Sequence, residues 1–261
     1  MDLWTLTQER QSLDPDELAV AIGLQAAEPE PDYRTRLLIR DAALSLLSFW
    51  GPKRFSDWLE GVSSRSQIGA CLEETFPEVG FPSLPKRICV STRPETIKRY
   101  LRELGEQLTT PVRVVIGGSS ALILAGLLSR HTEDIDLVDE VPESIRGMRA
   151  SLKQLQAKHR LHLAHFQSHY LPSGWEDRTH SQGKMGQLDV HSVDPLDILT
   201  GKLLSKREKD QGDLLELTPR AFSREQLASR LEACRAHLSD PELRASAEHN
   251  WNVLFGETLP V

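Results

Sequence analysis

The sequence predicts a protein of mixed α and β structure, with a small mixed β-sheet core between a helical N-terminal region and a helical C-terminal extension. Three observations support this fold class. Apolar residues recur at helical spacing over the first part of the chain, β-branched segments alternate with helical ones in the middle, and helical spacing returns at the end. We expect the three parts to span residues 1–85, 86–218 and 219–261.

The N-terminal region contains four segments with apolar residues near a 3.6-residue period, separated by Pro, Gly and Ser. Three prolines in residues 76–87 indicate a stiff linker, and we place the domain boundary there. The region could position a substrate, inhibit the core or stabilise it. The segments are PDELAVAIGL, YRTRLLIRDAALSLLSFWG, FSDWLEGV and SQIGACLEETF.

The middle of the chain alternates between helix and strand signals. A helix is expected to begin at Pro94 and end at Gly105, because Pro suits a first helical position and Gly a stop. A further helix is expected over residues 143–160. The expected strands are PVRVVIGG, EDIDLV, a segment near 161–167, and GQLDVHSV, with the apolar helix SALILAGLL between the first two.

The C-terminal part carries clear helix start signals. Asp194 followed by Pro195 gives an N-cap and a first helical residue, which open a helix over LDILTGKLLSKREKD. Two later segments begin with the S-x-x-E/Q pattern of a capping box. These pairs are Ser223 with Gln226 and Ser239 with Glu242.

Composition narrows the class of protein. Of 261 residues, 39% are hydrophobic and 26% are charged, and no apolar run reaches the roughly 18 residues of a membrane span. The net charge of -7 argues against broad nucleic-acid binding, which depends on a basic surface. Cys71, Cys89 and Cys234 lie too far apart to indicate a disulfide framework or a zinc site. The N-terminus lacks a signal-peptide pattern, so we expect a cytoplasmic protein without a membrane partner.

Asp134 and Asp136 form the first candidate site. In a strand, Ile135 and Leu137 point toward the core, so the two carboxylates share the opposite face. Like charges so close together repel and need a counter-charge. A divalent cation with oxygen ligands, Mg²⁺ or Mn²⁺, would supply it.

Gly117, Gly118 and Ser119 form the second half of this site. They lie where a strand leads into a helix, and exposed backbone N–H groups at such a point favour an anion. Ser119 is expected at the helix N-cap. A phosphate-binding turn beside metal-binding carboxylates is the smallest set of groups needed to transfer a phosphoryl or nucleotidyl group.

Asp189 is a candidate third carboxylate. It stands between Leu188 and Val190, so it points away from the core, where it could bind a second metal or activate a hydroxyl. The alternative is a solvated aspartate at a strand edge.

Four histidines offer a possible zinc site only if their segment is helical, because their spacing then puts them on one face. The α/β order calls for a strand there, which favours ordinary surface histidines. They are His159, His162, His165 and His169.

The stretch GGSSALILAGLLSRHTEDIDLV resembles the nucleotidyltransferase superfamily typified by DNA polymerase β and the kanamycin and tRNA CCA-adding enzymes. More narrowly, the chain is similar to bacterial nucleotidyltransferase-like proteins that include abortive-infection type II toxins. The resemblance spans roughly residues 112–217, and Ser120, Ser205 and a variable third acid depart from the group's pattern. Besides that stretch it rests on Arg130, on residues 171–178, and on Asp197, Lys202, Arg207, Lys209, Asp210 and Asp213 in that order.

This resemblance implies a Mg²⁺-dependent enzyme that moves a nucleoside monophosphate from an NTP to a hydroxyl acceptor on RNA, protein or a small molecule. Asp134 and Asp136 would bind metal, Asp189 would be a third ligand or base, and Lys202 would hold the triphosphate. The alternative is a degenerate member that binds nucleotide or protein without turnover, such as one half of a toxin–antitoxin pair with a cognate antitoxin. The nucleotide-binding set would be Gly117, Gly118, Ser119, Arg130, Lys202 and Arg207.

The basic residues after Lys202 admit two interpretations. On one continuous helix, Lys202, Lys206 and Lys209 share a stripe. They would then face the nucleotide, or form a solvated basic surface paired with Asp210 and Asp213.

Overall fold

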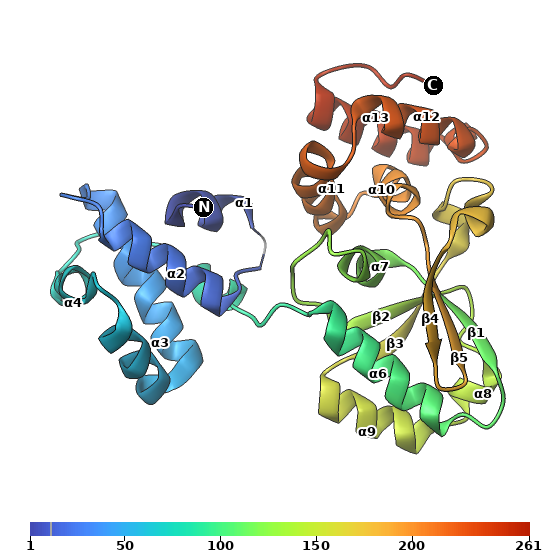
Figure 1. Cartoon of the computed structure of the whole chain (residues 1–261). Coiled ribbons are helices and arrows are strands. Elements are labelled where there is room, and N and C mark those ends of the chain that lie inside the picture. Colours follow the sequence, from blue (N-terminus) through green and yellow to red (C-terminus); the bar gives the residue numbers. More distant parts are fainter. Residues whose placement is uncertain (11) are drawn as a thin grey trace. The chain divides into compact units, whose positions relative to one another are not determined.

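A computed structural model describes residues 1–10 and 12–261, which form two compact units, residues 1–91 and 92–261 (Figure 1). The first unit is helical. The second combines a five-stranded mixed sheet with helices, and it includes the C-terminal extension. This architecture confirms the predicted fold class.

Helices make up most of the first unit, and three of them begin at an aspartate. The side chains of Asp2, Asp14 and Asp32 accept hydrogen bonds from backbone N–H groups in the first turn, which satisfies donors that a helix end leaves free. The helices are α1 (Leu3–Glu9), α2 (Pro15–Ala26), α3 (Tyr33–Gly61), α4 (Arg65–Glu73) and α5 (Leu84–Arg87).

Helix α3 combines two segments that the sequence predicts as separate helices. The break lies at Gly51, whose φ of 79° is not helical, and Pro52 follows it. Glycine adopts this φ without the steric cost that other residues pay, and the proline removes one backbone donor. The helix therefore kinks at the boundary that the sequence predicts, and it continues beyond that boundary to Gly61.

The sheet of the second unit has the order β3-β2-β1-β5-β4. Strand β1 runs antiparallel to β2 and parallel to β5, while β2 and β3 are parallel. Strand β4, which the sequence patterns miss, forms a hairpin with β5. The strands are β1 (Val112–Ile116), β2 (Asp134–Val138), β3 (His162–Phe166), β4 (His180–Met185) and β5 (Leu188–Ser192).

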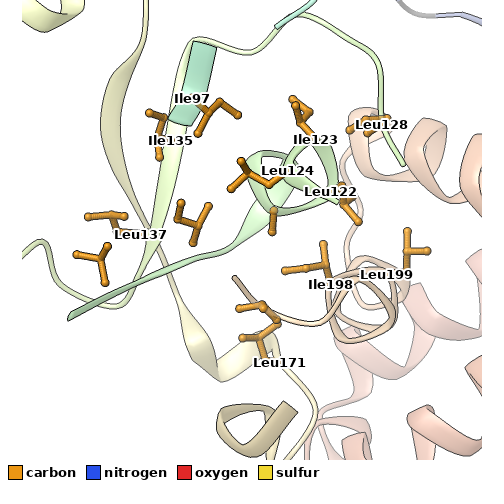
Figure 2. Close-up of a cluster of buried hydrophobic side chains, with 14 of the residues drawn as sticks. Ile97, Leu122, Ile123, Leu124, Leu128, Ile135, Leu137, Leu171, Ile198 and Leu199 are labelled. Carbon is orange, nitrogen blue, oxygen red and sulfur yellow. The ribbon is translucent and has the colours of Figure 1, made fainter. Parts of the chain in front are cut away.

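Helices α6 and α9 pack on one face of the sheet (Figure 1). Helix α7 contacts both strand β2 and helix α10. Within α7, Leu122, Ile123 and Leu124 are buried between the apolar side chains of β2 and those of α10 (Figure 2). Each fully buried aliphatic side chain contributes about 1.5–3 kcal/mol. The helices are α6 (Pro94–Gln107), α7 (Gly118–Leu124), α8 (Glu143–Arg146), α9 (Arg149–His159), α10 (Pro195–Leu203), α11 (Glu208–Ala221), α12 (Arg224–Leu231) and α13 (Pro241–Phe255).

Three predicted helix limits are wrong. Helix α6 continues past Gly105, which is buried against the Met185 backbone so closely that a Cβ there would lie 1.8 Å from the carbonyl oxygen of Met185. Asp240, not Ser239, caps α13. The helix predicted over residues 143–160 is divided into α8 and α9.

The helix predicted to run from Pro195 through Asp210 is also interrupted. Helix α10 ends at Leu203 and α11 begins at Glu208. Lys202, Lys206 and Lys209 therefore do not form a stripe on one helix. Because of this break, Lys202 lies on α10, Lys206 in the connection and Lys209 on α11.

Candidate active site

A pocket of about 530 Å³ opens in the second unit where β1 ends and α7 begins. Asp134 and Asp136 of β2 line one side, and residues around the break between α10 and α11 line the other. The start of α13 adds a further wall, through Leu243 and its neighbours. The pocket therefore brings carboxylates, a helix start and basic side chains together.

The Asp136 carboxylate lies directly against Gly118. A Cβ on Gly118 would be 2.1 Å from Asp136 Oδ2, and Gly118 has a φ of +55°. A Cβ on Gly117 would approach the Phe166 ring to 2.9 Å, and the Gly117 N–H donates to the Asp136 carbonyl at 2.8 Å. Glycine is thus needed at both positions, because any side chain would displace the carboxylate or the ring.

Asp136 and Asp134 repel each other at this site. The pKa of Asp136 is raised, first because the carboxyl is buried and then because Asp134 is close, while Lys209, Lys202 and Arg207 oppose this effect. Asp134 is less buried and lies 2.9 Å from Nε2 of His162 on β3. Two crowded carboxylates provide only oxygen donors, so this pair fits a hard divalent cation such as Mg²⁺.

Arg130 ties the start of α7 to α11. Its Nη2 donates a short hydrogen bond to Ser119 Oγ, and its Nη1 lies 2.6 Å from Asp213 Oδ1. All three side chains are buried. The prediction that Ser119 caps the helix is wrong, since Gly117 occupies the cap position and the Ser119 hydroxyl accepts from Arg130 instead.

Lys202 belongs to the same buried network. Its ammonium group forms a short ion pair with Asp210 and lies 2.9 Å from Asp213 Oδ2. Asp210 also accepts from Arg207 Nε at 2.7 Å. Burial by itself would raise the pKa of Asp210, but the charge of Lys202 and hydrogen bonds from Lys202, Ser205 and Arg207 outweigh it, so the pKa is lowered.

Lys209 also lines the pocket, but its surroundings differ from those of Lys202. Within the described part of the chain it has no ion-pair partner within 4 Å, although it lines the pocket with Asp136. Its pKa is lowered, first by partial burial and then by the charges of Arg130 and Lys202. An anion entering the pocket would relieve this repulsion. The sequence places Lys209 in the family motif and on the expected basic stripe, whereas the resemblance assigns the triphosphate to Lys202.

Asp189 lies elsewhere on the sheet. In the parallel pair of β1 and β5 it is opposite Arg113, whereas Asp136 bonds to Gly117. Gly117 lies four residues after Arg113, which is about 13 Å along the strand direction at 3.3 Å per residue. The Asp189 carboxylate is 3.3 Å from His191 Nε2 and does not line the pocket. The structure therefore does not bring Asp189 together with Asp134 and Asp136.

The histidines named above are distributed over separate contacts. His159 Nε2 is 3.1 Å from Glu103 Oε2, His162 contacts Asp134, and His165 lines the pocket. No group of three or more His, Cys, Asp or Glu side chains suited to a metal occurs among residues 1–10 and 12–261. The Asp134 and Asp136 pair therefore offers two carboxylates to a cation, and phosphate oxygens and water would have to supply the other ligands.

The comparison with known proteins identifies the family. A family model described as a nucleotidyltransferase of unknown function (DUF6036) matches residues 95–244. The match covers more than half of the chain, so the chain belongs to this family. Membership confirms the predicted superfamily and implies a nucleotide substrate, whereas the narrower relation to abortive-infection type II toxins stays a prediction.

The other comparisons add no relative, since neither a curated protein nor a solved structure matches the chain. In the described part of the chain, no helix has both the length and the apolar character required to cross a membrane.

Proposed function

We propose that the second unit is a Mg²⁺-dependent nucleotidyltransferase that moves a nucleoside monophosphate from an NTP to a hydroxyl acceptor. One observation carries the proposal: the Asp136 carboxylate packs against Gly118 at the start of α7, with Asp134 in the same pocket. Family membership supports the class of reaction. The tight contact holds the Gly118 backbone, where phosphate would bind in this proposal, beside the two carboxylates.

Asp134 and Asp136 would hold Mg²⁺ or Mn²⁺, which when bound neutralises phosphate charge. The N–H groups at the start of α7 would face the β- and γ-phosphates. Among the basic residues, Lys209 is best placed to contact phosphate, because Lys202 and Arg130 already pair with aspartates. We therefore assign Lys202 and Arg130 to the support of the pocket.

The acceptor hydroxyl oxygen would bond to the α-phosphorus. The bond from that phosphorus to the oxygen bridging the β-phosphate would break, pyrophosphate would leave, and the hydroxyl proton would pass to solvent. Such a transfer depends mainly on positioning and charge neutralisation. In the proposed reaction the pocket supplies both.

A catalytically degenerate binding protein is the second candidate function. Two observations favour it: Asp189 lies outside the pocket, and internal ion pairs occupy Lys202 and Arg130. Such a protein would bind an NTP or a protein partner, for example a cognate antitoxin, without turnover.

Incubation with each of the four α-labelled NTPs and Mg²⁺ separates the two candidates. We expect the wild-type protein to transfer label to an acceptor in a cell extract, and Asp136→Asn to transfer none. Glu106→Gln, a change on the exposed side of α6, is the matched control and should keep wild-type transfer. Nucleotide binding without transfer by the wild type would favour the degenerate protein instead.

A further inference from the structure

Thr92 is the first residue of the second unit, and it binds the chain segment that leads into Asp134. The Thr92 N–H donates to the Arg130 carbonyl at 2.9 Å. The Thr92 hydroxyl donates to the Thr132 carbonyl at 2.9 Å and accepts from the Thr132 N–H at 3.0 Å. Thr92 therefore holds both ends of residues 130–132.

Residues 130–132 support two parts of the active-site pocket. The Arg130 guanidinium donates to Ser119 Oγ at the start of α7. The Thr132 hydroxyl lies 3.3 Å from the backbone carbonyl oxygen and 3.3 Å from the backbone nitrogen of Asp134, the first residue of β2. Both Ser119 and Asp134 line the pocket. A displacement of this segment would therefore move the Ser119 hydroxyl and the Asp134 carboxylate together.

The supporting segment depends on individual contacts for its position. Residues 127–133 form neither helix nor strand, so they lack the repeated backbone hydrogen bonds of regular structure. The ion pair of Arg130 with Asp213 holds one side chain of this loop. The bonds from Thr92 hold its backbone, and Thr132 is buried, so water does not replace them easily.

The residue before Thr92 is bound to the first unit. The Ser91 N–H donates to Asp14 Oδ2 at 3.2 Å, and the Cys89 N–H donates to the Leu13 carbonyl at 3.0 Å. The hydrogen bonds of the two units therefore meet at consecutive residues. A rotation of the first unit has to be absorbed by the few backbone dihedrals of Ser91 and Thr92, as in a hinge.

We propose that Thr92 is a positioning residue for the pocket, and that the Ser91–Thr92 peptide couples the N-terminal unit to the Asp134 and Asp136 pair. The inference rests on the proposed function, because that function assigns metal and nucleotide to the pair. Such coupling is reciprocal. Mg²⁺ and NTP in the pocket stabilise the bonds of Thr92 and, through the peptide, the bond of Ser91. A ligand that reorients the first unit in turn changes the affinity of the pocket.

Amide hydrogen exchange without metal or nucleotide tests the hold of Thr92 by itself. Thr92→Val removes both hydroxyl bonds at nearly constant volume, whereas Thr92→Ser keeps the hydroxyl. We expect Thr92→Val to speed exchange of the Thr132 and Asp134 amides about tenfold, as for the loss of about one hydrogen bond. Thr179→Val, which removes a hydroxyl bond to the Glu176 carbonyl at 3.2 Å, is the matched control and should change neither rate. Unchanged exchange in Thr92→Val would overturn the positioning role.

Titrations with Mn²⁺ alone, and with each NTP in Mg²⁺, test the consequence for the pocket. We expect Thr92→Val to weaken both kinds of binding about tenfold, as for loss of a group that orients metal ligands. Thr92→Ser should restore wild-type affinity, and Thr179→Val should keep it. A merely structural role would lower stability in urea and leave both affinities unchanged, and that result would overturn the proposal. A wild-type protein that binds neither probe would overturn the proposed function and the coupling with it.

A flexible Gly-Ser-Gly insertion between Ser91 and Thr92 tests the link between the units. In the wild type, NTP and Mg²⁺ should slow amide exchange at both residues. In the insertion variant, the slowing should remain at Thr92 and disappear at Ser91. No slowing at Ser91 in the wild type, or equal slowing there in both proteins, would overturn the coupling.

Discussion

The Lys202 ammonium group lies 2.9 Å from Asp213 Oδ2 in the interior of the second unit, and both side chains are more than 90% buried. Removing one partner of such a pair leaves an uncompensated charge and costs about 3–5 kcal/mol. We therefore predict that Lys202→Ala loses about this much free energy of unfolding in urea titrations. Lys206→Ala, at an exposed ion pair with Glu242, should lose less than about 1 kcal/mol. A Lys202→Ala protein as stable as the wild type would contradict the supporting role.

Asp210 should make the stability of the protein depend on acid pH. Its pKa is lowered, although burial opposes this, because Lys202 and the hydrogen bonds stabilise the charged form. A carboxyl with a depressed folded pKa contributes stability that is complete above its unfolded value and is lost as pH falls through the folded value. We expect the free energy of unfolding to decline below about pH 4. In Asp210→Asn that decline should be shallower, and an unchanged slope would count against the assignment.

Gly118→Ala should abolish nucleotide binding in Mg²⁺. The new Cβ would meet Asp136 Oδ2 at 2.1 Å, and the backbone φ of +55° is strained for alanine. Gly126→Ala separates the two effects, because Gly126 has a φ of +72° with no atom within 4 Å of a Cβ. Calorimetry should show loss of binding in the first variant only. Equal losses in both would assign the effect to backbone strain.

Lys209→Met should weaken NTP binding without lowering stability. Its ammonium group has no carboxylate partner within 4 Å in the described structure. Removing it therefore leaves no buried carboxylate without a partner. Loss of one charged hydrogen bond to phosphate corresponds to about 1.5–3 kcal/mol, or roughly ten- to hundredfold in Kd. Lys206→Met, whose partner is Glu242, should change Kd by much less. If Kd changed equally in the two variants, the effect would reflect the net charge of the protein and not a contact between Lys209 and phosphate.

Local sequence patterns predicted the elements that place the first half of the site. Alternation along EDIDLV is sufficient to put Ile135 and Leu137 inward and the two aspartates outward, because a strand has a fixed period. The capping box at Ser223 and the start of α10 at Asp194 also follow from local hydrogen bonding, and the structure confirms both.

The rest of the site depends on contacts between distant segments, which local patterns do not encode. The register of β1 with β5 puts Asp189 opposite Arg113 and away from Asp136, and the residue pattern of neither strand specifies that register. Because of the break after Leu203, the predicted lysine stripe becomes a buried Lys202, an exposed Lys206 that pairs with Glu242, and a Lys209 that lines the pocket. Lys202 is buried because Asp210 and Asp213, on the next helix, compensate its charge.

The role of the Asp134 and Asp136 pair as the metal and nucleotide site is the central claim. Isothermal titration of the wild-type protein and Asp136→Asn with each NTP, in Mg²⁺ and in EDTA, tests it most directly. We predict that the wild type binds at least one NTP much more tightly in Mg²⁺ than in EDTA, and that Asp136→Asn loses this dependence on Mg²⁺. Binding to both proteins with the same affinity, with and without Mg²⁺, would contradict the claim.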